Sequence, residues 1–177
     1  MMHTPRTLST TAPRQPLARA LLALATAASA VPAAVAADDP MLQRLALCQD
    51  SWFEWKDDEA RTKRYVADVE RRFEPIPQGA GAFRPKAPVH ALGYPIAQLY
   101  PQSVGMGVGF SLIVQADFAQ ARAAIERQLG QPMTCTASDG ARACEIQLDD
   151  KKTALLMTGQ NGTAKTSLVG CYYFYEK

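Results

Sequence analysis

The chain has 177 residues, of which 47% are hydrophobic and 20% are charged, and its formal net charge is +2. This length and composition are typical of one folded domain with a core of its own. A charge so close to zero gives no electrostatic reason to expect binding to nucleic acid or to an anionic membrane.

The first 36 residues have the layout of a secretory signal peptide. Three arginines precede an uncharged stretch, residues 20–36, that is rich in Ala and Leu and ends Ala34-Val35-Ala36. We expect cleavage after Ala36 and export to the bacterial periplasm, with an uncleaved anchor as the alternative. The mature domain, residues 37–177, then has 16 basic and 17 acidic residues, because the leader holds three arginines and no acid. No later apolar run approaches the ~18 residues that span a bilayer.

Residues 37–74 are predicted to be helical. Apolar residues recur at helical spacing, Asp57-Asp58 offers a fresh N-cap, and a second apolar stripe follows it. We therefore expect two helices with a break near Lys56, and basic side chains that face solvent. The predicted buried positions are Met41, Leu42, Leu45, Cys48, Trp52 and Trp55, followed by Tyr65, Val66, Val69 and Phe73.

Residues 75–104 are predicted to form a long loop, because six prolines lie in them. Proline excludes a continuous helix and disfavours a central strand, although short edge strands at 89–92 or 96–100 stay open. A loop this long is functional or poorly ordered. Its aromatic and histidine side chains are candidate contacts for a partner, or else anchor the loop to the core: Phe83, His90, Tyr94 and Tyr100.

Residues 105–177 are predicted to form a compact α+β unit. A strand covers 108–115, and Asp117 is the N-cap of a helix that ends at Gly130. An antiparallel meander follows. The helix should bury Phe118, Ala121, Ile125 and Leu129, and the meander should turn at Asp139-Gly140, Asp150-Lys151 and Asn161-Gly162.

The turns of the meander predict a cross-strand register. A two-residue turn at Asp139-Gly140 places Cys135 opposite Cys144 in a non-hydrogen-bonded pair, close enough for a disulfide. The other two turns place Ile146 opposite Leu155, and Leu155 opposite Leu168, so that these three form one apolar row.

The same register predicts the second disulfide. It puts Cys171 on the face opposite Cys144, which leaves Cys48–Cys171 by elimination. A bulge at Gly170 would reverse this parity, so the other connectivities stay open. A Cys48–Cys171 bond would close a loop of more than a hundred residues, which the chain-entropy model values at ~4–5 kcal/mol.

The mature domain has a single histidine, His90, and this limits its chemistry. A His-rich zinc site is impossible, the cysteines lack C-x-x-C pairs, and there is no G-x-S-x-G motif. The G-x-G-x-G spacing at residues 105–109 enters a strand, and so does not indicate a nucleotide site. We predict no catalytic residue, no metal and no cofactor.

The C-terminal run from Cys171 to Tyr175 is the densest aromatic stretch. In a strand, Tyr172 faces one side and Tyr173 and Tyr175 face the other. One set should pack in the core. Tyr173 and Tyr175 are predicted as further partner contacts, since exposed tyrosines are good interface residues.

Together these features predict an α+β fold. It comprises an antiparallel β-meander with one packed helix, preceded by an N-terminal helical segment and a long Pro-rich loop, and two disulfides. The function that we expect is a non-catalytic binding module in the periplasm, for example an inhibitor or immunity-type protein that acts on another envelope protein. The alternatives are an envelope hydrolase that uses paired carboxylates or His90, and a structural component of an envelope assembly.

Overall fold

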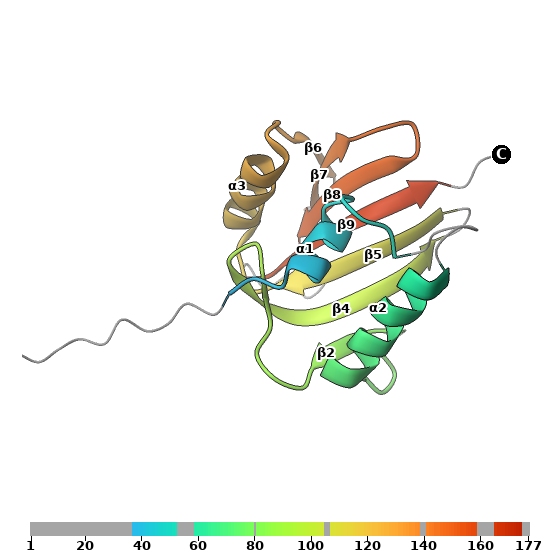
Figure 1. The fold of residues 1–177 in the computed structure, drawn as a ribbon. Helices are drawn as coiled ribbons and strands as arrows, with labels where there is room; N and C mark the ends of the chain where they lie inside the picture. The colour runs from blue at the N-terminus through green and yellow to red at the C-terminus, as the bar shows by residue number, and fades with distance from the viewer. Residues whose placement is uncertain are drawn as a thin grey trace, which may run out of the picture. The chain divides into compact units, whose positions relative to one another are not determined.

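An antiparallel sheet with helices packed against it forms this α+β fold, which Figure 1 shows as a computed structural model. The structure describes residues 37–52, 59–79, 81–104, 107–138, 141–158 and 165–174. The sheet order in these ranges is β1-β2-β4-β5-β9-β8-β7-β6, and β3 pairs with β4. The strands are β1 (Phe73–Pro75), β2 (Phe83–Pro85), β3 (His90–Ala91), β4 (Tyr94–Val104), β5 (Gly107–Val114), β6 (Thr134–Ser138), β7 (Ala141–Gln147), β8 (Lys152–Thr158) and β9 (Ser167–Phe174).

Two helices precede the sheet in the sequence, as predicted: α1 (Pro40–Ala46) and α2 (Glu59–Arg72). The Asp39 carboxylate begins α1 by accepting a hydrogen bond of 2.9 Å from the Leu42 N–H. Because α1 ends at Ala46, Cys48 and Trp52 are buried in the segment after the helix rather than on it. Trp55, the Asp57-Asp58 cap and Lys56 lie outside the described residues.

The third helix, α3 (Phe118–Leu129), forms as the sequence predicted. Asp117 is its N-cap, and Gln120 completes a capping box with it. Gly130 ends the helix with φ of +70°, a left-handed conformation that glycine adopts without strain. The buried side chains are Phe118, Ala121, Ala124 and Ile125, with Leu129 packed against them.

Residues 75–104 contain strands rather than one long loop. The strand β4 has eleven residues and pairs with β5 from Ile96 to Val104, with a bulge after Ile96. The prolines are tolerated because of their places in the sheet: Pro95 is near the start of β4, and Pro101 lies beyond Leu99, the last residue of β4 to pair with β2. Proline content therefore overstated the irregularity of this segment.

The register of the meander agrees with the prediction in one hairpin and differs in two. Cys135 lies opposite Cys144, as predicted. In contrast, Ile146 lies opposite Ala154, and Leu155 lies opposite Gly170, so the predicted row of Ile146, Leu155 and Leu168 is wrong. The physical reason in the second hairpin is a three-residue turn between Leu148 and Lys152, closed by the Asp149 carboxylate accepting from backbone N–H groups.

One face of the sheet, called the core face below, packs against the helices. Figure 1 shows α1 and α2 on the same side of the sheet. Helix α1 contacts β5 and β9, and α3 contacts β8 and β9. The strand residues that cluster with the helices all have the same side-chain parity, as far as the described residues show. On β4, β5, β7, β8 and β9 they are Ile96, Leu99, Val108, Phe110, Leu112, Val114, Cys144, Ile146, Ala154, Leu156, Val169, Cys171 and Tyr173.

Two disulfides link these elements, and their predicted pairing is confirmed. Cys48–Cys171 has a Cα–Cα distance of 5.1 Å and a sequence separation of 123, and joins the segment after α1 to β9. Cys135–Cys144 joins β6 to β7, with Cα atoms 4.0 Å apart. The elimination that suggested Cys48–Cys171 was nevertheless wrong, because Cys171 and Cys144 share the core face.

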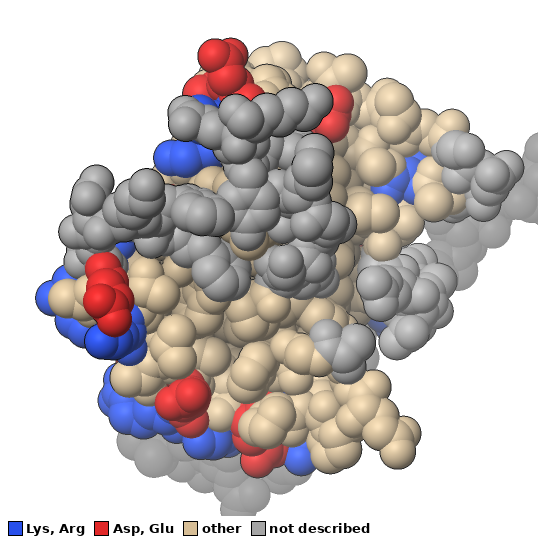
Figure 2. Space-filling model, turned by 90° about the vertical axis from the view of Figure 1, so that its right-hand side faces the viewer, with Lys and Arg blue, Asp and Glu red and all other residues tan. Residues whose placement is uncertain are grey.

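Many charged side chains on the described surface lie in pairs of opposite sign. On the face shown in Figure 2, Lys and Arg atoms lie beside Asp and Glu atoms along the margins. Examples are Lys63 with Glu59 and Arg84 with Glu74, both at 2.6 Å. Within the described ranges, no helix combines the length and the apolar character needed to cross a membrane.

Candidate functional site

The side of the sheet opposite the core face is the candidate site and is called the outer face below. Because side chains alternate along a strand, the residues of β4, β5, β9, β8 and β7 between the core positions all point to this side. Of these positions, only Glu145 carries a charge, although the chain as a whole is 20% charged. The outer face comprises Gln98, Tyr100, Gly109, Ser111, Ile113, Ala143, Glu145, Gln147, Thr153, Leu155, Met157, Leu168, Gly170 and Tyr172.

An apolar row crosses the middle of the outer face. Ile113 lies opposite Leu168, which in turn lies opposite Met157. Ile113 and Leu168 are only 8% and 5% exposed, yet they do not belong to the cluster that packs against the helices. Met157 is 37% exposed, the one large hydrophobic side chain of the described residues with that much exposure. The row is therefore a second apolar cluster with an accessible end.

A neighbouring group of small residues lets side chains lie close to the strand backbones. A Cβ at Gly109 would sit 3.2 Å from the Tyr172 ring, so this ring lies against β5. A Cβ at Gly170 would sit 2.3 Å from the Ser111 Oγ, so the hydroxyl occupies the space that a side chain would need. Ser111 is fully buried, and its Oγ has no hydrogen-bond partner.

Two tyrosines lie on the outer face. Tyr100 lies opposite Ser111, and its hydroxyl donates a hydrogen bond to the Gln98 side chain. Tyr172 lies opposite Gly109, and burial raises the pKa of its hydroxyl above the ordinary value. Both side chains are half-buried. Each therefore presents an apolar ring and a polar tip, a combination that suits contact with a protein surface.

The residues predicted as partner contacts are dispersed in the structure. Phe83 and Tyr94 are half-buried and pack against the core, which is the anchoring role left open above. Tyr100 lies on the outer face. His90, in β3, accepts a hydrogen bond of 2.7 Å at its backbone carbonyl from the Asp39 N–H, and its Nδ1 is buried with no partner.

A cleft of about 720 Å³ lies beside His90. Its other described lining residues include Arg84 and Lys86 but no carboxylate. Arg84 pairs with Glu74, and the Lys86 ammonium donates to the last carbonyls of α2. Among the residues that the structure describes, no group of three His, Cys, Asp or Glu side chains is arranged to hold a metal ion.

Three acidic side chains have structural contacts in the fold. Asp117 caps α3, and Asp149 closes the turn before β8. Asp50 pairs with Arg61 at 3.2 Å and accepts a hydrogen bond from the Tyr65 hydroxyl. Burial and this carboxylate raise the pKa of Tyr65. These contacts assign the three carboxylates to the fold.

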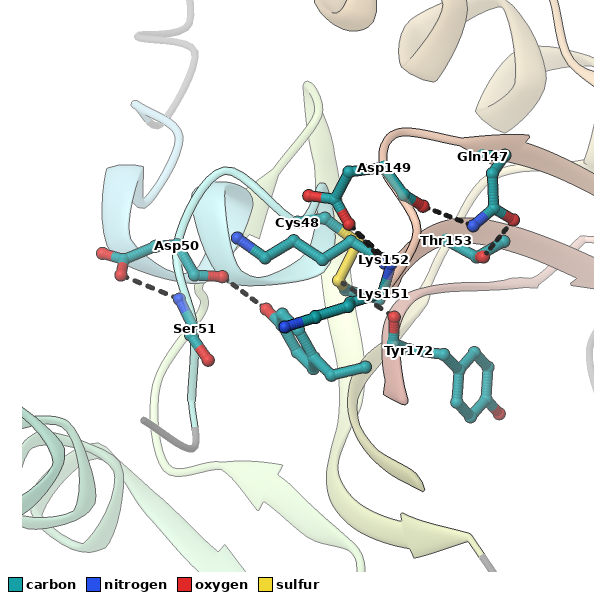
Figure 3. The surroundings of a disulfide bond; sticks show 11 residues. Cys48, Asp50, Ser51, Gln147, Asp149, Lys151, Lys152, Thr153 and Tyr172 are labelled. Atoms are coloured by element: carbon teal, nitrogen blue, oxygen red, sulfur yellow. Dashed lines mark hydrogen bonds between the residues drawn. A yellow bond between two sulfur atoms is a disulfide. The ribbon is translucent and has the colours of Figure 1, made fainter. Parts of the chain in front are cut away.

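Tyr173 lies next to the Cys48–Cys171 disulfide in sequence, and its contacts link the same two segments as the disulfide does. Figure 3 shows the surroundings of this disulfide. Its side chain is 8% exposed, and its hydroxyl donates a hydrogen bond to the Asp50 carbonyl. The Lys152 ammonium lies 6.0 Å from the centre of the ring. Tyr173 is therefore a core residue that connects β9 to the segment after α1. Tyr175 lies outside the described residues.

Tyr172 is the aromatic residue of the outer face that the sequence reasoning did not select. Figure 3 shows its ring pointing away from the disulfide. A signal for this was present in the sequence, because a bond from Cys171 to the N-terminal helical segment places residues 171 and 173 on the helix side of β9. Strand alternation then places Tyr172 on the outer face.

No protein-family model, no curated protein and no solved structure matches this chain.

Proposed function

We propose that the protein is a non-catalytic binding module of the inhibitor or immunity type, which holds another protein of the bacterial envelope. The near absence of charge on the outer face carries this proposal. The centres of protein interfaces are depleted in charged residues and enriched in aromatic residues and Met. The outer face combines Tyr100, Tyr172, Leu155 and Met157 around its apolar row, with Glu145 at its β7 side.

Rigidity supports the same function. The outer face is built on the central strands of a sheet whose other side is packed against helices and linked by the Cys48–Cys171 disulfide. A surface that is already ordered loses little conformational entropy when it binds. Binding through residues on paired strands therefore costs less conformational entropy than binding through the same residues on a loop.

Export supports a partner in the envelope. The leader ends at the predicted cleavage site after Ala36, and the first residues that follow it make contacts in the fold. The Asp38 carboxylate accepts from the Gly93 N–H at 2.9 Å, and Asp39 caps α1. Cleavage after Ala36 would therefore keep these two contacts. Two disulfides are typical of proteins that work in an oxidising compartment.

The test is a capture experiment with matched variants of the mature, oxidised protein. Met157→Lys adds a charge at the exposed end of the apolar row. Gln128→Lys adds the same charge at an exposed position on α3 and serves as the control. Each immobilised protein is incubated with periplasmic extract, and bound proteins are quantified by mass spectrometry.

We expect one stoichiometric partner with the native protein and with Gln128→Lys, and its loss with Met157→Lys. If the partner is an enzyme, its activity should fall when it is mixed with the native protein. A partner that Met157→Lys retains in full, or no partner at all, would contradict the proposal. The cleft beside His90 would then be the next surface to alter.

A further inference from the structure

The strand β6 is an unprotected edge of the sheet. It pairs with β7 alone among the described strands and ends the sheet order. Residues 134–137 are all exposed, and the strand contains no charge and no proline. The opposite edge, β1, has only three residues and includes Pro75. Natural proteins protect sheet edges by such shortness, proline or charge, so an edge that lacks them is available for pairing.

The register shows which groups of β6 point outward. The Cα atoms of Cys135 and Cys144 are 4.0 Å apart, which identifies a non-hydrogen-bonded pair. Two residues along, Ala137 and Arg142 form the next pair of the same kind. Cys135 and Ala137 therefore direct their N–H and C=O groups away from β7, toward the place of an added strand.

A cavity of about 280 Å³ adjoins this edge, between the β6–β7 hairpin and the start of α3. Its lining includes Phe118, Ala119 and Arg122 from α3, and Ala137 and Arg142 from the hairpin. It lies on the core face of the hairpin, where side chains opposite Cys135 and Ala137 would project. A strand added to β6 would place alternate side chains in it.

The cavity contains a positive charge that is positioned but not paired. The Arg142 guanidinium lies 4.6 Å from the centre of the Phe118 ring, a cation–π contact that fixes its place. Within the described residues it has no carboxylate partner. Arg122 differs, since it pairs with Glu126 at 2.8 Å. Arg142 is therefore the charged group of this cavity to which the described residues supply no counter-ion.

We propose that an extended segment of a partner protein adds to β6 as a further strand and places a glutamate, opposite Ala137, on Arg142. Neighbouring strands are about 4.8 Å apart, so the glutamate and Arg142 would start two spacings from each other. The Ala137 methyl group leaves the space between them open. Backbone hydrogen bonds supply the affinity in this mode of recognition, and the side-chain pocket supplies the selectivity. The inference concerns an edge of the sheet and does not depend on binding to the outer face.

The test uses two blocked synthetic peptides, Thr-Thr-Val-Glu-Val-Thr and the same sequence with Gln in place of Glu. Each is titrated into isotope-labelled mature, oxidised protein and followed by NMR. We expect the Glu peptide to shift resonances of β6 and the Arg142 side chain and to slow amide exchange at Cys135 and Ala137. An opposite-charge pair on a sheet should make it bind about two- to fivefold more tightly than the Gln peptide.

Two variants isolate the two parts of the proposal. Arg142→Gln should bind both peptides equally. Ala137→Pro should lose binding because it removes an outward N–H while leaving the hydrogen bonds to β7. Ala137→Ser, which keeps that N–H, is its control and should bind normally.

Three results would overturn the proposal: neither peptide slows exchange at Cys135 and Ala137, both peptides bind native protein alike, or the edge is already occupied by a second copy. The last would appear without peptide, as protection of β6 that rises with protein concentration. Because no outer-face residue is changed, these results are separate from those of the Met157→Lys experiment.

Discussion

The two faces of one sheet differ in what their side chains do. On β8, Leu156 is fully buried against the helices, whereas its neighbour Met157 is 37% exposed on the outer face. The same alternation runs along β5 and β9. The helices and the Cys48–Cys171 disulfide concentrate stability on the core face. The outer face carries the more accessible apolar residue of this pair, and substitution of Met157 should destabilise the fold less than substitution of Leu156.

The largest loss of stability should come from removing the Cys48–Cys171 disulfide on the core face. Replacing both Cys48 and Cys171 by Ala should lower the free energy of unfolding by about 5 kcal/mol, because a long loop is released in the unfolded chain. The control replaces Cys135 and Cys144, whose separation is only 9. The same model gives ~3 kcal/mol for it. Urea unfolding measures both, and equal losses would contradict this ranking.

A sharper test compares adjacent residues of β8. Leu156→Ala should cost about 2–5 kcal/mol, because it leaves a cavity in the packed core. Met157→Ala should cost less than about 1 kcal/mol, since its side chain is partly solvated and surface substitutions have small effects. Thermal and urea unfolding of the two variants measure the difference. Similar losses would mean that the outer face is as tightly packed as the core face.

Gly170→Ala tests how closely side chains approach the backbone on the outer face. The added Cβ would meet the Ser111 Oγ at 2.3 Å and the Phe110 carbonyl at 3.0 Å. We expect a loss of about 1–3 kcal/mol, the usual cost of overpacking. Adding Ser111→Gly should recover part of it, which a double-mutant cycle measures. Strict additivity would show that Ser111 is not the obstacle.

The smallest expected effect is the pH dependence due to Tyr172. Burial raises its folded-state pKa above the unfolded value of ~10, because the phenolate is disfavoured. Its contribution to stability is complete below that unfolded pKa and is lost as the pH rises through the folded one. Tyr172→Phe should therefore lose less stability than native protein between neutral and strongly alkaline pH. Parallel losses in both proteins would show that Tyr172 ionises as freely folded as unfolded.

The sequence by itself determined the elements that depend on local contacts. Asp117, Gln120 and Gly130 specify the ends of α3 through hydrogen bonds and backbone conformations within a few residues. The Cys135–Cys144 pair follows equally locally from the length of one hairpin. For the outer face, strand alternation and the predicted Cys48–Cys171 bond together indicated that Tyr172 points away from the helices.

Only the tertiary structure decided the features that depend on distant partners. The strand β4 is stabilised by hydrogen bonds to β5, which outweigh the irregularity that its prolines suggest. The register of β8 and β9 depends on turn length, and a shift of one residue moves every side chain to the other face. That is why only the fold assigned Leu155 to the outer face. Local chemistry fixes where an element begins and ends, whereas the side that it presents is set by what packs against it.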